Sequence, residues 1–209
     1  IVTWTRVPGT RVAHVRISSF SEGAGAELNT VLTEIQSREI ESIVLDLRNN
    51  PGGLLNPAVR VSSQFLDEGL VMLRREAQAT PEPVPIEEGV KTVNLPLVLL
   101  VNEGTASAAE IVTGALQDAD RATVIGQTTS GAGTVLHTFT LSDGSMMLLA
   151  VEEWRTPEGR VIWHEGLEPG LQVSQTPGVQ PLLPRREETM TVDEFQAYED
   201  APLHRAVAL

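Results

Sequence analysis

Residues 96–118 read PLVLLVNEGTASAAEIVTGALQD, and the pattern of this stretch changes once along its length. Residues 96–102 form a short apolar run, which is typical of a strand buried on both faces. After a turn of small residues, apolar positions return at helical spacing: Ile111, Val112, Ala115 and Leu116. The stretch therefore predicts a buried strand, a tight turn and a helix, with Ser107 in the turn.

The same alternation of strand and helix continues outward from this stretch. Strands are predicted at residues 12–17, 42–47 and 122–126. Helical patterns follow the first two strands, with apolar positions at Leu28, Val31, Leu32 and Ile35 (to about Arg38), and at Leu55, Val59 and Phe65. Alternating strands and helices indicate an α/β fold built from parallel β-α units.

Other regions of the chain have a different character. Residues 80–88, TPEPVPIEE, are rich in proline and acidic residues, and we expect a surface loop there. From residue 133 the pattern predicts a β-hairpin with its tight turn at Asp143 and Gly144. The tail from residue 174 is richer in proline and charge, and its last residues, PLHRAVAL, predict a short docked helix.

Composition excludes several classes of function. The chain has 209 residues, 41% of them hydrophobic, which suits one large domain. Its net charge of −13 repels phosphate backbones, so a nucleic-acid partner is not expected. The absence of cysteine excludes thiolate chemistry, and four dispersed histidines make a metal site improbable. Neither a membrane-spanning segment nor a signal peptide is visible.

Ser107 admits two interpretations. The pattern Ser107-Ala-Ala-Glu110 matches a capping box, in which the serine only caps the helix. The small residues around it, however, leave room for a second backbone to approach, and the turn follows the carboxyl end of a buried strand, where ligands bind in parallel sheets. The helix N-terminus would also stabilise a developing oxyanion. Serine at such a turn is a nucleophile only with a base beside it.

Residues 48–53, RNNPGG, are the second candidate element. In isolation they predict a plain turn. In the functional interpretation, the backbone at Gly52 and Gly53 comes close to a substrate carbonyl and donates an N–H, with the N–H of Ala108 as the second donor of an oxyanion hole. We therefore predict that Ser107 and the Gly52-Gly53 turn lie side by side.

Four blocks carry a resemblance to a known family: RISSFSE (16–22), IVLDLRNNPGGLL (43–55), VNEGTASAAEIVTGALQD (101–118) and VIGQTTSGAGTV (124–135). Together with GLEPGLQV (166–173), they resemble the carboxyl-terminal processing proteases, or tail-specific proteases, over about residues 12–173. The resemblance implies a crotonase/Clp-protease-like core of ββα units, with the β-hairpin region appended. Residues 1–209 are then a peptidase core whose last part, 174–209, is an extension. Members commonly carry a PDZ domain before this core, and none is visible in the chain.

The resemblance also implies roles for individual residues. Ser107 matches the nucleophile of a Ser/Lys dyad, and Gly53 and Ala108 match the oxyanion-hole donors, with Gly52 next to them as a further candidate. The lysine of the family's Gly-Lys-Gly is replaced here by Ala132, and the glutamine that orients the lysine is replaced by Leu136. The nucleophile side of the site is therefore retained, while the base is missing or unconventional.

Three departures cluster around the missing base, because Ser130 also replaces a common aromatic residue. A single engineered change from lysine to alanine would leave the glutamine in place, so natural divergence explains the set more simply. Lys91 is predicted to be a solvated surface charge, and strand alternation points His137 away from the side of Leu136. Glu110 is assigned to capping. The remaining histidines are isolated in sequence: His14, His164 and His204.

The predicted function is that of a serine endopeptidase core, cleaving near protein C-termini through an acyl-enzyme. The chain either is inactive or uses an unconventional base. The alternative is a non-catalytic pseudoprotease that binds peptide tails or an apolar ligand. The expected partner is the C-terminal segment of a peptide or protein, homo-oligomerisation is left open, and no cofactor or metal is required. By resemblance, an extracytoplasmic location is expected.

Overall fold

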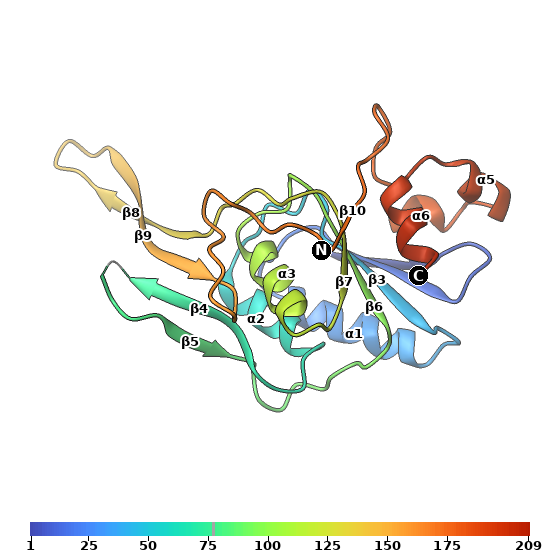
Figure 1. The fold of residues 1–209 in the computed structure, drawn as a ribbon, viewed down its shortest axis with the longest axis horizontal. Coiled ribbons are helices and arrows are strands. Elements are labelled where there is room, and N and C mark those ends of the chain that lie inside the picture. Colours follow the sequence, from blue (N-terminus) through green and yellow to red (C-terminus); the bar gives the residue numbers. More distant parts are fainter. Residues whose placement is uncertain (77) are drawn as a thin grey trace.

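A six-stranded sheet forms the centre of the protein. The computed structural model describes residues 1–76 and 78–209, and the sheet has the strand order β1-β2-β3-β6-β7-β10 (Figure 1). Its strands are β1 (Val2–Arg6), β2 (Val12–Ile17), β3 (Ser42–Asp46), β6 (Leu97–Val101), β7 (Thr123–Gly126) and β10 (Leu171–Gln172). β1 runs antiparallel to β2, and every other neighbouring pair is parallel.

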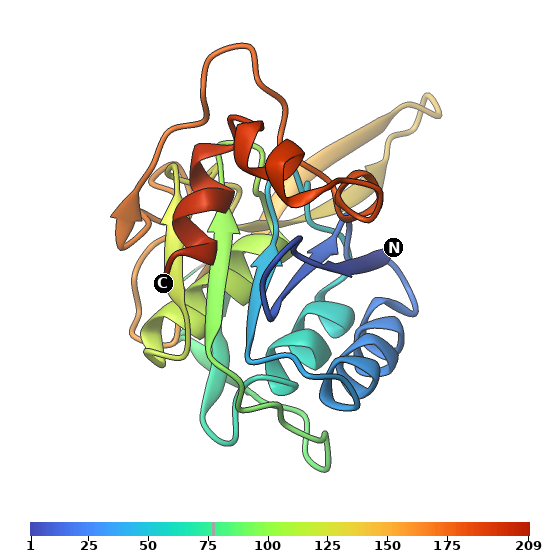
Figure 2. The same ribbon diagram turned by 90° about the vertical axis from the view of Figure 1, so that its right-hand side faces the viewer.

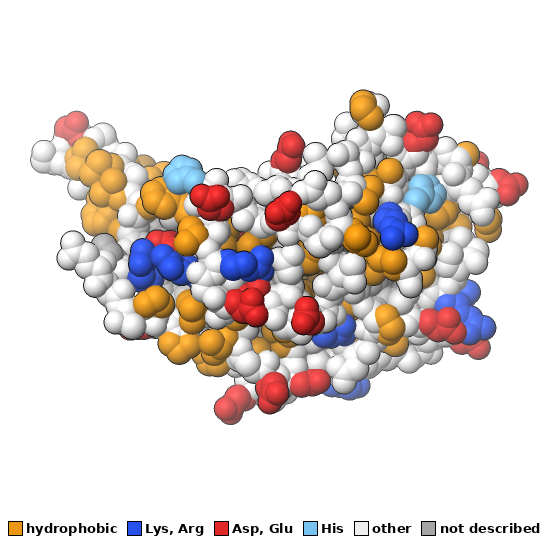
Figure 3. Space-filling view, viewed as in Figure 1, with side chains coloured by type: hydrophobic (Ala, Val, Ile, Leu, Met, Phe, Trp, Pro, Cys, Tyr) orange, Lys and Arg blue, Asp and Glu red, His pale blue; other side chains and the backbone are white. Residues whose placement is uncertain are grey.

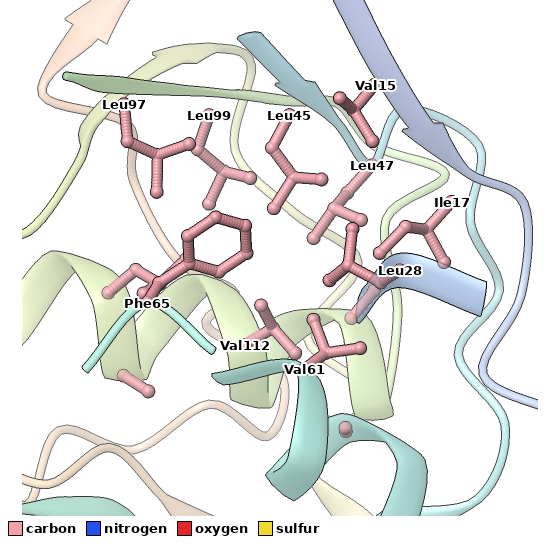
Figure 4. Packing of buried hydrophobic residues seen from close by; sticks show 14 of the residues in the cluster. Val15, Ile17, Leu28, Leu45, Leu47, Val61, Phe65, Leu97, Leu99 and Val112 are labelled. Carbon is pink, nitrogen blue, oxygen red and sulfur yellow. The ribbon is translucent and has the colours of Figure 1, made fainter. Parts of the chain in front are cut away.

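Helices cover both faces of this sheet (Figure 2). One face packs on α1 (Ala24–Gln36), α2 (Leu55–Ser63) and α3 (Ala108–Asp118), and the other on α4 (Pro184–Glu187), α5 (Val192–Ala197) and α6 (Ala201–Val207). Leu45 and Leu99 point to the first face, where they meet Val112 (Figure 4). The alternate residues Val44 and Leu100 point to the second. Burial on both faces explains the continuous apolar runs of these strands.

A smaller antiparallel sheet lies beside the core, in the order β5-β4-β9-β8. It consists of β4 (Leu70–Glu76), β5 (Glu82–Pro85), β8 (Thr134–Thr140) and β9 (Met146–Arg155). β4 pairs only with the end of β9 that lies nearest the core, so the β8-β9 hairpin projects beyond the body. Figure 3 shows hydrophobic side chains gathered on it, and its exposed members are Leu136, Phe139, Leu141, Met146, Met147, Leu148 and Leu149.

The predicted α/β class and the predicted hairpin are confirmed, and four strands are additions. β1, β4 and β10 were not predicted. The loop expected at residues 80–88 contains β5, so that prediction is wrong in part. Pro83 and Pro85 cannot donate to a ladder, but β5 is an edge strand that pairs on one side only, where proline is tolerated. Phe65 lies beyond the end of α2 yet remains buried. None of the described helices combines the length and apolar character that crossing a bilayer requires.

A buried ionic cluster fastens the C-terminal tail to the sheet. His14 on β2 lies between two carboxylates, with Nδ1 2.5 Å from Glu187 and Nε2 3.2 Å from Asp46. Arg48 bridges Asp46 and Asp200, with nitrogen–oxygen distances of 2.8 and 2.6 Å. The sequence context suggested that His14 is isolated. That expectation is wrong, because its partner Glu187 lies 173 positions away in the chain. The histidine joins the tail to the core.

The cluster shifts the proton affinity of its members. Burial lowers the pKa of His14, but hydrogen bonds and charges from Asp46 and Glu187 outweigh burial and raise the pKa of His14 to about 9. Burial raises the pKa of Asp46, but Arg48 and His14 outweigh it and hold that pKa far below its usual value. A histidine with a raised pKa stabilises the fold fully below its unfolded pKa of about 6.5, and this stabilisation is lost as pH rises through about 9.

The free energy of unfolding should therefore fall between pH 6 and pH 9.5. His14→Gln should cost about 3–5 kcal/mol at pH 6, because it leaves buried carboxylates unpaired, and the difference from the parent should shrink at pH 9.5. Urea unfolding followed by circular dichroism measures both. His137→Gln, on the exposed hairpin, is the control and should behave like the parent. If the free energy of unfolding of His14→Gln fell with pH as steeply as that of the parent, the pH dependence would not come from His14.

Candidate active site

The turn between β6 and α3 holds Ser107 in a strained conformation. Its φ is 53° and its ψ is −121°, a backbone conformation that residues other than glycine rarely adopt. Such strain persists only where the surroundings enforce it. Here Thr105 fixes the approach to the turn, because its hydroxyl donates to the carbonyl of Leu47 at 2.9 Å. The serine is thus presented at the N-terminus of α3.

The turn after β3 lies directly against this serine. The N–H of Ala106 donates to the carbonyl of Asn50 at 2.9 Å. A Cβ atom added at Gly52 would lie 2.7 Å from the Cβ of Ser107 and 2.9 Å from the nitrogen of Ala108, and the φ of Gly52 is +95°. Only glycine fits there. The predicted proximity of Ser107 and the glycine turn is confirmed.

The backbone donors of the two turns are not equivalent. The N–H of Gly52 already donates to the side-chain oxygen of Asn50 at 2.9 Å. The N–H groups of Gly53 and Ala108 have no acceptor within the described residues. Gly53 is held in place by its bridge to Phe20, and a Cβ at Gly53 would lie 2.5 Å from the carbonyl oxygen of Phe20. Two unpaired donors therefore remain beside Ser107.

Glu110 connects the serine turn to the loop that contains Ala132. One carboxylate oxygen of this buried side chain accepts from the N–H of Ser107 at 2.8 Å and from the N–H of Ala132 at 2.9 Å. The other accepts from the N–H of Gly131 at 2.7 Å and from the hydroxyl of Thr129 at 2.6 Å. The capping role predicted for Glu110 is thus present, and a long-range role is added. The four donors satisfy a carboxylate that would otherwise be costly to bury.

Ser107, Ala132 and Leu136 line one cavity of about 540 Å³. The retained spacing of the Gly131-Ala132-Gly133 segment predicts this arrangement, and the structure confirms it. The rest of the wall comes from the glycine turn, α2 and the smaller sheet: Gly53, Leu54, Leu55, Arg74, Thr134, Val135, Glu152 and Trp154. Most of these side chains are apolar, and the charged ones are Arg74 and Glu152.

No sequence pattern pointed to Arg74 or Glu152, because their place depends on the pairing of β4 with β9 beside Ser107. The other candidate bases lie outside the cavity lining. His137 pairs with Leu149 in the projecting hairpin, and Lys91 lies on the surface, where its amine contacts Gln36 at 3.1 Å. The ring of His164 stacks on Trp163 at 4.4 Å between centroids, and that of His204 packs on Phe195 at 4.8 Å.

A second hollow lies next to the cavity. It encloses about 720 Å³ between the start of α1 and α2, and Leu54 and Leu55 line both spaces. Gly25, Val59 and Arg60 are among its other lining residues.

Comparisons with known proteins agree on one family. Residues 11–173 match the model of Peptidase family S41. The carboxyl-terminal-processing protease of Synechocystis sp. is 38% identical over 194 residues, which is 92% of this chain and 44% of that protein. The carboxy-terminal processing protease CtpA of Bacillus subtilis is 36% identical over 169 residues, 81% of this chain and 36% of that protein.

A solved structure of a processing protease is similar to this chain as well. The photosystem II D1 C-terminal processing protease superposes with a TM-score of 0.76 at 32% identity, over 86% of this chain and 49% of that one. The chain thus spans less than half the length of these relatives. Because the family model covers most of the chain and the relatives are similar at this level, the chain belongs to peptidase family S41, the family of the carboxyl-terminal processing proteases.

Proposed function

We propose that the chain is the catalytic core of a serine peptidase that cleaves peptide bonds near protein C-termini. The observation that carries the proposal is the strained Ser107 turn, which lies beside two unpaired backbone donors in a cavity. The names of the relatives support cleavage at the carboxyl-terminal end of a protein substrate.

In this proposal Ser107 attacks the substrate carbonyl and forms an acyl-enzyme. The N–H groups of Gly53 and Ala108 hold the oxyanion, and the N-terminus of α3 adds its favourable dipole. Gly52 is not a donor, because its N–H is already bound by Asn50. The role of Gly52 is to let the two turns approach each other.

The cavity favours an apolar side chain next to the scissile bond. Leu55, Val135 and Trp154 form apolar walls close to the serine turn. The adjoining hollow along α1 and α2 would receive residues further along an unstructured tail, since Leu54 and Leu55 are common to both. A flexible C-terminal segment satisfies both requirements.

A second candidate function is capture of peptide tails or an apolar ligand without cleavage. It is favoured by Ala132 and Leu136, which place apolar groups where the family has a lysine and its orienting glutamine. Loss of a general base typically lowers a rate by about 10² to 10⁴. A slow peptidase and a protein that only binds peptides would therefore have the same fold, and a measurement of cleavage would distinguish them.

Ser107 should react with a fluorophosphonate probe, and Ser107→Ala should abolish both labelling and cleavage of an unstructured apolar peptide. Labelling requires an activated hydroxyl, so it separates a peptidase from a binder. Mass spectrometry of the labelled chain locates the modified residue, and Ser130→Ala, outside the cavity lining, is the control. A chain that binds the peptide without labelling or cleavage would support the binder instead.

Gly52→Ala should abolish cleavage and lower stability. The added methyl group would collide with the backbone of the serine turn, and loss of oxyanion-hole geometry costs about 10² to 10³ in kcat. Gly69→Ala is a matched control, because Gly69 has a φ of +99° but nothing within 4 Å of its Cβ position. Both variants should lose about 1 kcal/mol or more through backbone strain, measured by urea unfolding, but only Gly52→Ala should lose activity. If Gly52→Ala and Gly69→Ala cleaved the peptide equally fast, the close contact between the two turns would not be needed for activity.

Ala132→Lys should raise peptide cleavage only in part, and adding Leu136→Gln should raise it further. A lysine acts as a base only if desolvation brings its pKa down from about 10.4 toward neutrality, and Leu136 supplies apolar surroundings without orienting the amine. The two changes should be non-additive, because both residues line one cavity. Cleavage by the parent, both single variants and the double variant tests this. A parent as fast as the double variant would show that another base already operates at full strength.

A further inference from the structure

The cavity around Ser107 contains one side chain able to accept a proton from the serine. Among the described residues that line it, Arg74 and Glu152 carry charge, and a guanidinium has no acceptor. Other candidates lie outside the lining, and the buried carboxylate of Glu110 is occupied by four donors. Among the lining residues, the carboxylate of Glu152 is therefore the candidate acceptor.

The register of β9 places Glu152 in this cavity. Glu152 pairs with Val135, but Leu136 pairs with Ala150, so Val151 is an extra residue on β9. Such a bulge re-aims side chains and is frequent beside active sites. On the adjacent strand, Arg74 pairs with Trp154, and Trp154 lies two positions from Glu152 on the same face. Arg74, Glu152 and Trp154 accordingly all line the cavity.

A cation lies beside this carboxylate. Oε2 of Glu152 lies 3.5 Å from Nε of Arg74, and a nitrogen of Arg74 lies 3.2 Å from Glu82. The side chain of Glu152 is 14% exposed, so it is partly shielded yet still reached by water. A charged carboxylate with a fixed partner is the proton-accepting form of the group.

We propose that Glu152 is the general base and acid of the reaction, in place of the missing lysine. This inference rests on the proposed peptidase function. The position of Ala132 in the same cavity matters, because a lysine there would bring a second cation toward the carboxylate. With alanine, Arg74 is the charged neighbour of Glu152 in the lining, and Glu76 pairs with Glu152 across the smaller sheet.

The proton follows a closed path. The carboxylate of Glu152 takes the proton of the Ser107 hydroxyl while the oxygen–carbon bond forms, and the carbonyl electrons move to the oxyanion held by Gly53 and Ala108. The oxyanion collapses, the carbon–nitrogen bond breaks, and Glu152 gives its proton to the leaving amine. Water then loses a proton to Glu152 as it attacks the acyl group. Collapse of the second intermediate returns that proton to Ser107.

Glu152→Gln should lower kcat/KM for an unstructured apolar peptide by about 10² to 10⁴. Glu153→Gln is the matched control, because Glu153 is also ion-paired, with Arg75 and Arg155 at 2.7 Å each, but does not line the Ser107 cavity. Glu152→Asp keeps the charge on a shorter chain and should retain part of the activity. The near-ultraviolet circular dichroism of each variant reports whether the fold is intact.

The pH profile supplies a readout that a purely structural role would not change. The pH dependence of kcat/KM reports the group that acts as the base in the free enzyme. Combining Glu152→Gln with Ala132→Lys should restore cleavage and move the acid limb upward in pH, because an amine then acts as the base. Such a shift of the pH profile would show that the introduced lysine has replaced Glu152 as the base.

The outcomes separate this inference from the proposed function. If Glu152→Gln cleaves as fast as Glu153→Gln while Ser107→Ala is inactive, Glu152 is not the base but the peptidase function stands. If the parent is inactive and Ala132→Lys cleaves, the serine machinery is intact without a native base, which also overturns the inference. If neither the parent nor Ala132→Lys cleaves, the proposed function and the inference both fail.

Discussion

The carboxylate of Glu110 determines the geometry of the whole site. It is fully buried, and its four donors come from both the serine turn and the segment from Thr129 to Ala132. A buried carboxylate without partners is costly, so each of these hydrogen bonds constrains the others. Position 132 consequently faces the Ser107 cavity whatever its side chain is. The frame around Ser107 does not depend on the side chain at position 132, because backbone N–H groups build that frame.

A second constraint acts on the other side of the serine. The strained backbone of Ser107 and the positive φ of Gly52 place two turns in contact, at a separation that excludes even a methyl group. Hydrogen bonds from Thr105 and Ala106 hold the turns together. Strain of this kind costs about 1–3 kcal/mol per residue and is offset by the surrounding fold. The unpaired donors of Gly53 and Ala108 result from this packing, and they do not depend on the base.

Features set by local periodicity could be predicted from the sequence, and those set by distant pairing could not. β2 was identified by alternation of apolar and polar residues, and β3, β6 and β7 by short β-rich apolar segments. The turn chemistry of Ser107 and Gly52 is local as well. β4 was missed because three of its residues are charged and its pairing partner β9 lies much later in the chain. His14 looked isolated because Glu187 lies in the tail. Glu152 was missed for the same reason, since its place depends on one bulge and on the register of three strands.

Two of the departures from the family pattern, Ala132 and Leu136, fit the carboxylate base that we propose. A lysine accepts a proton only when neutral, so it needs apolar surroundings and a polar group to orient the amine. A carboxylate accepts in its charged form and needs a cation instead, which Arg74 provides. Leu136 then has no polar partner to orient, and Ala132 avoids a second positive charge beside Glu152. The base that we propose therefore lies on the smaller sheet, while Glu110 and the glycine turn hold Ser107 and the unpaired donors of Gly53 and Ala108 in place.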